Sequence, residues 1–143
     1  MLRSGTARRS DSPWVSPLVL VPKKEDGWRP YGDYRALNAM TVTDQYSVRH
    51  IADFTHQLAG RKVFSTIDLV KAYHQIPVHS DDVATTAITT PFGLFEFPYM
   101  SFGLRNVAQK IQRFIDEILR DVDFCYAYID DVLVASTSEE EHE

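Results

Sequence analysis

The chain has 143 residues, 44% of them hydrophobic, which suits one domain with a real core. No apolar run approaches the roughly 18 residues that cross a bilayer. The single cysteine, Cys125, excludes an internal disulfide and a cysteine-based zinc site, and its apolar surroundings favour a buried free thiol.

The net charge of −5 is spread unevenly along the chain. Residues 1–35 carry seven Lys/Arg against four Asp/Glu, whereas residues 121–143 carry eight acids and no Lys/Arg. A basic N-terminal part and an acidic C-terminal part suggest contact with a polyanion at the first and cation binding at the second. Ordinary solvated charge explains the same pattern equally well.

The first half of the chain predicts a hairpin, a short helix and a strand. "SPLVLVPKKEDGWRPYGDYRAL" reads as an apolar strand, a turn at residues 25–27 and a second strand from Trp28, which gives a hairpin with a basic tip. "HIADFTHQLAG" predicts a short helix that ends at Gly60. "KVFSTID" is rich in β-forming residues and predicts a strand that ends on Asp68.

The second half predicts another hairpin and an amphipathic helix. "TTAITT" and "LFEFPYM", joined by "PFG", give the hairpin, and apolar residues recur with helical period from Asn106 to Arg120. Two short strands flank the aspartates of "YAYIDDVLVAS". In "STSEEEHE", Ser138 and Glu141 form a capping box, so we expect a truncation at the start of a helix rather than a frayed acidic tail.

The adjacent carboxylates Asp130 and Asp131 lie at the junction of two apolar runs. A simple hairpin turn is one explanation, because Asp is a common turn residue. However, two ionised carboxylates about 5 Å apart repel by roughly 3 kcal/mol at an effective dielectric constant near 20. Between buried strands, that repulsion would raise one pKa or require a cation.

Asp68 also ends a β-rich run, so neighbouring strands would bring all three carboxylates together. Such oxygen ligands suit Mg²⁺, which takes its remaining ligands from water and substrate phosphates. Two such ions about 4 Å apart can activate a hydroxyl and stabilise a leaving pyrophosphate. Spacing alone leaves open that the three aspartates are unrelated.

Four linked motifs resemble one known family. "SPWVSPLVLVPKKEDGWRPYGDYRALN", "FSTIDLVKAYHQI", "TTPFGLFEFPYMSFGLRN" and "YAYIDDVLVAS" occur in the order and spacing of the reverse transcriptase of gypsy-type LTR retrotransposons. The resemblance runs from about Ser12 to the end of the chain. It favours a catalytic role for the aspartate pair over a simple turn.

The resemblance implies a role for each matching residue. Asp68, Asp130 and Asp131 would hold two catalytic Mg²⁺ ions, for which Mn²⁺ is a possible substitute. Tyr73 would exclude the 2′-hydroxyl of the incoming nucleotide. The other matching residues are expected to bind the dNTP or to lie beside the primer: Lys24, Arg29, Phe102 and Gly103 for the dNTP, and Tyr128 for the primer terminus.

The fold implied by the resemblance is α+β, the fingers and partial palm of a right-hand polymerase with an incomplete split βαββαβ sheet. Residues of about 1–61 and 78–105 would be fingers-like, and about 62–77 and 106–143 palm-like, with thumb, connection and ribonuclease H absent. The implied partners are an RNA or DNA template-primer, dNTP and the remainder of a pol polyprotein, with no membrane. The resemblance implies a cytoplasmic virus-like particle with possible nuclear access.

Three functions stay open at this point. The first is a fragment of an RNA-directed DNA polymerase that is inactive, or nearly so, by itself. The second is a degenerate or domesticated nucleic-acid-binding remnant, which is suggested by departures from the family pattern. The third, a cyclase-type palm, is disfavoured because it needs no template clamp like "WRPYGDYRALN". The departures are Tyr31, Ser47, Ser101 and the segment "NVAQKIQ".

Overall fold

The structure is a computed structural model that describes residues 5–24 and 27–142. The chain divides into two compact units. The first unit comprises residues 1–43 and 73–107, and the second comprises residues 44–72 and 108–143. No helix in the described residues is long and apolar enough to cross a membrane.

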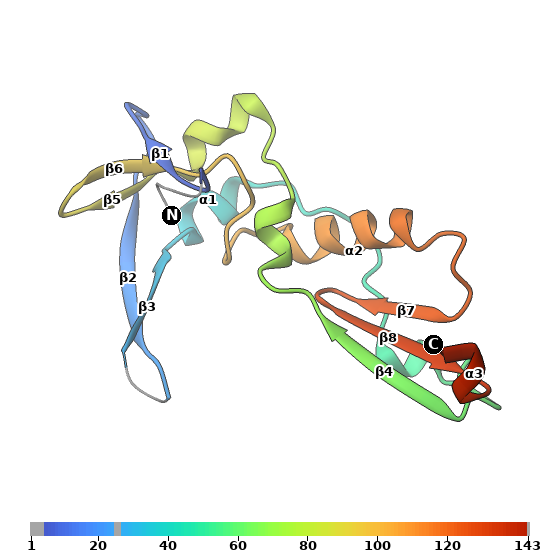
Figure 1. Ribbon diagram of the computed structural model, residues 1–143. Helices are drawn as coiled ribbons and strands as arrows, with labels where there is room; N and C mark the ends of the chain where they lie inside the picture. The colour runs from blue at the N-terminus through green and yellow to red at the C-terminus, as the bar shows by residue number, and fades with distance from the viewer. Residues whose placement is uncertain (1–4, 25–26, 143) are drawn as a thin grey trace. The chain divides into compact units, whose positions relative to one another are not determined.

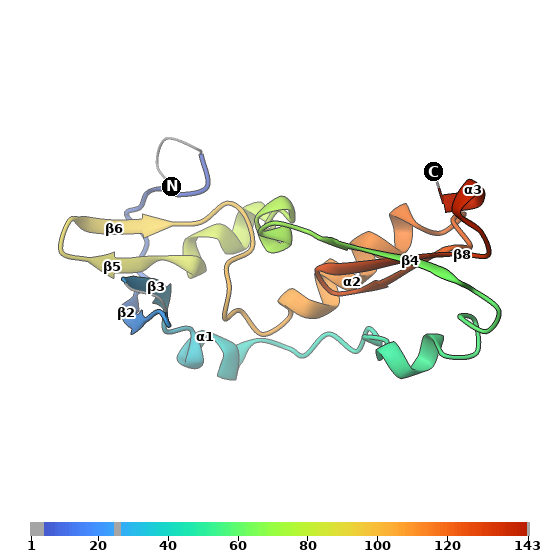
Figure 2. The same ribbon diagram turned by 60° about the horizontal axis from the view of Figure 1, so that its bottom comes forward.

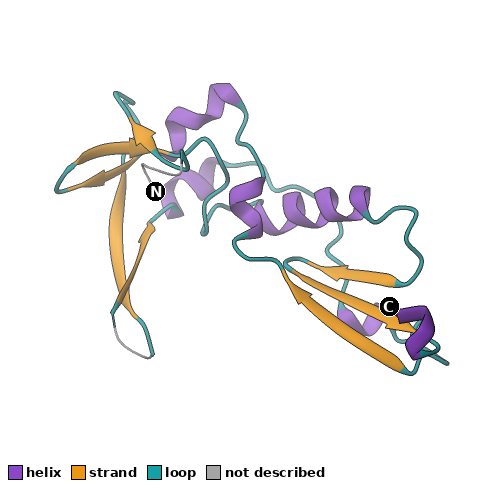
Figure 3. Cartoon of the chain, in the orientation of Figure 1, coloured by secondary structure: helices purple, strands orange, loops and turns teal. Residues whose placement is uncertain are grey.

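The first unit is built on a mixed five-stranded sheet with the strand order β1-β6-β5-β2-β3. Its strands are β1 (Arg8–Arg9), β2 (Ser16–Pro22), β3 (Trp28–Gly32), β5 (Ile88–Thr90) and β6 (Gly93–Glu96). β2 pairs in parallel with β5, and the other pairings are antiparallel. Strands β2 and β3 extend as a long two-stranded ribbon (Figure 3).

A buried tyrosine and a glycine fix the packing of the first unit. Tyr34 is 2% exposed, and its hydroxyl donates to the carbonyl of Thr86 at 2.9 Å. Burial raises the pKa of Tyr34 to about 12. A Cβ at Gly32 would lie 2.4 Å from Cδ1 of Ile88, so the buried side chain of Ile88 would have to shift to accept one. The sheet therefore packs closely at this point.

Short helices and turns complete the first unit. They are α1 (Arg35–Met40), η3 (Ser80–Thr86) and η2 (Ala72–Gln75), the last of which begins at the boundary between the units. The side chain of Asn38 donates to the carbonyl of Gly103 at 2.7 Å and accepts from the backbone N–H of Arg105 at 2.8 Å. Asn38 thus ties helix α1 to the loop that precedes the long helix.

The second unit contains a three-stranded antiparallel sheet with the order β4-β8-β7. These strands are β4 (Val63–Asp68), β7 (Cys125–Tyr128) and β8 (Asp131–Ser136). β4 is an edge strand on which only Val63 is partly buried. Its two large apolar side chains, Phe64 and Ile67, are each 50% exposed.

Helical segments pack against this sheet. Helix α2 (Val107–Ile118) lies alongside the strands in both ribbon views (Figures 1 and 2) and buries Ile111, Gln112 and Ile115. The single-turn helix η1 (Ile51–Phe54) brings the ring of Phe54 to a centroid distance of 5.2 Å from Tyr126. These two rings and Ala135 form a buried cluster.

Most of the predicted elements are confirmed. Both hairpins, the strand that ends on Asp68, the long helix and the strands beside the aspartates are present. Residues 25–26 of the first predicted turn lie outside the described residues. Helix α3 (Glu139–His142) begins after Ser138, whose hydroxyl accepts the N–H of Glu141 at 3.3 Å, as the capping pattern predicted.

The helix predicted in residues 50–60 is wrong in its extent. Only Ile51–Phe54 is helical, as a 3₁₀ turn. The hydroxyl of Thr55 donates to the carbonyl of Ala52 at 2.6 Å, and such side-chain bonds compete with continued helix. Gly60 ends the segment with a positive φ of 83°. Residues 44–61, assigned on sequence to the fingers-like part, pack within the second unit.

Candidate active site

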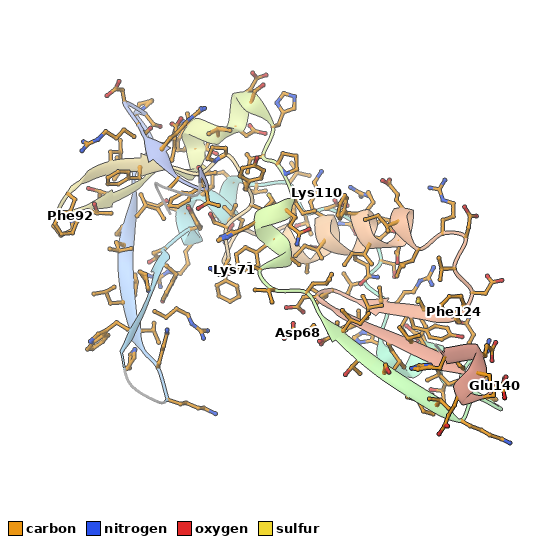
Figure 4. All side chains as sticks on the ribbon, viewed as in Figure 1. Asp68, Lys71, Phe92, Lys110, Phe124 and Glu140 are labelled. Atoms are coloured by element: carbon orange, nitrogen blue, oxygen red, sulfur yellow. The ribbon has the colours of Figure 1, made fainter. Side chains whose placement is uncertain are left out.

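Two of the three predicted aspartates face each other across adjacent strands. Asp68 is the last residue of β4 and pairs directly with Asp131, the first residue of β8. The N–H of Leu69 donates to the carbonyl of Asp130 at 2.8 Å, which makes the Asp68–Asp131 pair a non-hydrogen-bonded one. In such pairs the Cα atoms lie about 4.5 Å apart and the side chains share one face. Figure 4 labels Asp68 where β4 ends.

Tyr128 extends this row on the same face. It is the last residue of β7 and pairs with Asp131 from the other side. Asp130 lies in the two-residue turn between Tyr128 and Asp131. All three aspartates are exposed, and Tyr128 is partly buried. The sheet register therefore brings Asp68, Asp131 and Tyr128 together, with Asp130 adjoining them in the turn.

The turn itself has an unusual backbone. Ile129 adopts a positive φ of 54°, in the left-handed region that a β-branched residue rarely occupies. Such a conformation costs on the order of 1–3 kcal/mol and persists only where the surroundings determine it. Its surroundings include the amide of Gln112, whose Oε1 accepts the N–H of Ile129 at 2.9 Å.

Gln112 is a residue that the sequence reasoning missed. It is fully buried on helix α2, and its Nε2 donates to the carbonyl of Ala127 at 3.0 Å. The available signal was a polar residue inside the apolar stripe of the helix, with Ala108 and Ile115 on the same face. Gln112 thus binds both strand β7 and the turn that carries Asp130.

The carboxylates fit a metal ion only as part of a larger ligand set. Within residues 5–24 and 27–142, no group of three or more His, Cys, Asp or Glu side chains is placed to hold an ion. Mg²⁺, however, is commonly held by one or two carboxylates with substrate phosphates and water. The strand-paired, exposed Asp68 and Asp131 suit that arrangement, with Asp130 adjacent in the chain.

The predicted nucleotide-binding residues all lie in the first unit. Tyr73 is half-buried, and its ring lies 6.4 Å from that of Phe102, centroid to centroid. Gly103 follows with a φ of 95°, and its nearest neighbours would be 3.8 Å from an added Cβ. The positive φ therefore favours glycine at position 103.

Lys24 and Arg29 occupy the basic end of the β2–β3 ribbon. Together with Val21, Pro22 and Lys23 they line a hollow of about 410 Å³. Both cationic side chains belong to exposed residues. This hollow can receive a compact anion such as a phosphate group, because Arg and Lys supply charge-assisted donors.

Comparison with known proteins identifies the family. The family described as "Reverse transcriptase (RNA-dependent DNA polymerase)" matches residues 21–143. The chain is 39% identical to the retrovirus-related Pol polyprotein from transposon 297 of Drosophila melanogaster, over 99% of this chain and 14% of that protein. Its identity to the corresponding polyprotein from transposon gypsy of the same organism is 36%, again over 99% of the chain and 14% of the relative. The chain belongs to the reverse transcriptase family.

Solved structures agree with the predicted fold. A foamy viral protease–reverse transcriptase in complex with double-stranded DNA aligns with a TM-score of 0.89 and 25% identity, over 99% of this chain and 25% of that one. The same viral protein in complex with an RNA/DNA hybrid gives a TM-score of 0.89, over 99% and 19% of the two chains. The α+β fingers and palm architecture predicted from sequence is confirmed. The chain spans about one seventh of the length of its curated polyprotein relatives.

Proposed function

We propose that the chain carries the catalytic part of an RNA-directed DNA polymerase. The reaction joins a primer 3′-oxygen to the α-phosphorus of a dNTP on an RNA or DNA template, and pyrophosphate leaves. The observation that carries the proposal is the strand pair Asp68–Asp131 beside a turn that holds Asp130. Family membership over residues 21–143 supports it.

The three carboxylates have the role of metal ligands in this proposal. Asp68, Asp130 and Asp131 hold two Mg²⁺ ions, or Mn²⁺ in their place. When bound, the ions lower the pKa of the attacking hydroxyl and stabilise charge on the leaving pyrophosphate. The strand register sets the spacing of the Asp68 and Asp131 backbones, and the turn that Gln112 binds carries Asp130.

The first unit supplies the nucleotide contacts. Lys24 and Arg29 bind the triphosphate in the hollow that they line. Tyr73, packed near Phe102, lies under the sugar and excludes a 2′-hydroxyl, the group that distinguishes RNA from DNA. The loop at Gly103 packs against the base. In the second unit, Tyr128 lies beside the primer terminus.

In this proposal the first unit corresponds to the fingers and the second to the palm. The partners are a template-primer, a dNTP and the remainder of a pol polyprotein. The chain and this remainder lie together in a cytoplasmic particle. Foamy viral relatives in complex with double-stranded DNA and with an RNA/DNA hybrid support the nucleic-acid partner. Because the chain matches about one seventh of its relatives, we expect the 143 residues alone to extend a primer at or near background.

A catalytically inactive nucleic-acid-binding remnant is the second candidate. One observation favours it: Oε1 of Gln109, on helix α2, is buried and has no hydrogen-bond partner in the described part of the chain. An unsatisfied buried acceptor costs about 1–3 kcal/mol, a cost that the loss of a former partner would leave behind. Gln109 belongs to the segment "NVAQKIQ" that departs from the family pattern.

A chimeric polyprotein separates the two candidates. The chain replaces the matching segment of the transposon 297 polyprotein, and Mg²⁺-dependent primer extension is measured. A polymerase gives extension that Asp130→Asn removes. A remnant gives template binding that weakens steeply with salt, and no extension above the Asp130→Asn background. In a parallel assay of the 143 residues alone, robust extension would contradict the expectation that they need the longer chain.

A further inference from the structure

A chain of hydrogen bonds leads from the aspartate turn to a loop far away in the sequence. It starts at Ile129, whose N–H donates to Oε1 of Gln112 at 2.9 Å. Because the strained φ of Ile129 sets the direction in which the following aspartate leaves the turn, the group that holds Ile129 also bears on Asp130. The contacts of Nε2 of Gln112 therefore also influence the position of Asp130.

The amide of Gln112 is oriented by two acceptors. Its Nε2 donates to the carbonyl of Ala127 at 3.0 Å and to Oδ1 of Asp116 at 2.9 Å. With Nε2 committed to these oxygens, Oε1 must face the turn. Reversing the amide would place a donor against the N–H of Ile129 and a carbonyl oxygen against two acceptors. Asp116 thus fixes which end of Gln112 meets the turn.

Asp116 is held in turn by the loop before η1. Its Oδ2 accepts the hydroxyl of Tyr46 at 2.6 Å. The ring of Tyr46 lies under the guanidinium of Arg113, with 4.7 Å between Cζ and the ring centroid. Arg113 donates to Asp44 at 2.8 Å, and Asp44 also accepts the backbone N–H of Tyr46 at 3.0 Å. The loop is therefore anchored at Asp44 as well as through the side chain of Tyr46.

We propose that Tyr46, Asp116 and Gln112 form a positioning relay that holds the strained turn and thereby sets where Asp130 points. All members belong to the second unit. The relay concerns the backbone of the turn, and its value for catalysis rests on the proposed function. Its members do not touch substrate; they act through Ile129.

The relay makes the turn sensitive to a hydroxyl on residue 46. Tyr46→Phe keeps the ring under Arg113 and removes only the bond to Asp116. Asp116→Leu removes both acceptors, whereas Asp116→Asn keeps an oxygen for Gln112 and a polar group for Tyr46. Tyr99→Phe, at a tyrosine in the first unit, is the matched control.

The test is hydrogen exchange of the 143-residue chain, read by mass spectrometry in peptides that cover residues 126–131. We expect Tyr46→Phe to speed exchange there by roughly two- to tenfold, the scale of one lost hydrogen bond. Asp116→Leu should exceed that, and Asp116→Asn and Tyr99→Phe should match the unmodified chain. Peptides covering residues 28–32 report the first unit and should not change.

Two results would overturn the relay. One is exchange in residues 126–131 that is unchanged by both Tyr46→Phe and Asp116→Leu. The other is acceleration of equal size in residues 28–32, which would mean a general loss of stability. Addition of Mg²⁺ tests the proposed function separately: it should slow exchange at residues 126–131 in the unmodified chain and not in Asp130→Asn. Absence of that effect would count against the metal site while leaving the relay result standing.

Discussion

The two units hold their candidate functional side chains in different ways. In the second unit, Asp68 and Asp131 are placed by strand register, and the turn between Tyr128 and Asp131 is held by the buried amide of Gln112. In the first unit, Lys24 and Arg29 are exposed on the β2–β3 ribbon. Strand register and the held turn therefore set the backbone positions of the aspartates, whereas Lys24 and Arg29 lie beside the tip of a two-stranded ribbon.

Charge follows the same division. The first unit carries eight Lys/Arg against seven Asp/Glu, and the second carries seven against thirteen. A nearly neutral unit with exposed cations suits an anionic ligand, and a strongly acidic unit suits cations. We therefore expect changes at Asp130 to act on cation binding and changes at Lys24 or Arg29 to act on anion binding.

The largest expected effect tests the second unit. In the chimeric polyprotein, Asp130→Asn should lower the rate of primer extension by roughly 10²–10³-fold, the scale on which loss of one preorganised electrostatic group acts. Steady-state extension at saturating dNTP measures it. Asp121→Asn, at an exposed acid outside the turn, is the control. Equal activity of both variants would break the assignment of Asp130.

A sugar-selectivity assay tests the first unit. Tyr73→Ala in the same polyprotein should reduce the preference for deoxynucleotides over ribonucleotides by roughly 10- to 100-fold, while deoxynucleotide use is largely kept. The reason is that the ring next to Phe102 would no longer fill the space of a 2′-hydroxyl. The ratio of kcat/KM for the two sugars measures it, and an unchanged ratio would remove Tyr73 from this role.

Sequence alone predicted the strands that carry the aspartates, because "KVFSTID" and "YAYIDDVLVAS" are β-rich runs that include them. It did not provide the pairing of Asp68 with Asp131. That register depends on which strand of the hairpin lies beside β4, and the exposed Phe64 and Ile67 give β4 no one-sided apolar pattern.

The hydrogen bonds of Gln112 could not be predicted from the sequence for a different reason. Helical periodicity marks apolar faces, and a buried amide inside such a face is read as an interruption rather than as a contact. The bond from Gln112 to Ala127 can be identified only when the position of helix α2 against strand β7 is known, and the bond to Asp116 then completes the set. The apolar residues around η1 are also spaced as in a helix. Phe54 is apolar because it packs against Tyr126, so the spacing does not require a long helix.

A stability measurement tests the close packing of Gly32 against Ile88 in the first unit. Gly32→Ala should lower the free energy of unfolding by about 1–3 kcal/mol, because the new Cβ would meet Ile88 at 2.4 Å. Both tryptophans, Trp14 and Trp28, lie in this unit, so their fluorescence during urea denaturation reports it. Thr89→Ala on strand β5 is the control, with an expected change within about 0.5 kcal/mol. Similar midpoints for the two variants would contradict the close packing.

The smallest expected effect is a pH dependence of strand β1. The hydroxyl of Ser10, and then Arg8, hold the pKa of Glu96 below its usual value of 4.5. Because the folded pKa is the lower one, the stabilisation is fully present above about pH 4.5 and is lost as pH falls through the folded pKa. Unfolding midpoints between about pH 6 and 3 should fall more for the unmodified chain than for Glu96→Gln. Parallel pH profiles would exclude this contribution.

The open edge of β4 has a consequence for how the protein behaves at high concentration. Strand β8 pairs with one side of β4, and none of the described strands pairs with the other. The N–H and C=O groups of Phe64 and Thr66 face that open side, because both residues occupy non-hydrogen-bonded positions opposite β8. The strand contains no proline and no lysine that would block intermolecular β-pairing. Copies of the chain are therefore prone to join edge to edge, and a lysine introduced by Thr66→Lys would act as a gatekeeper against such assembly.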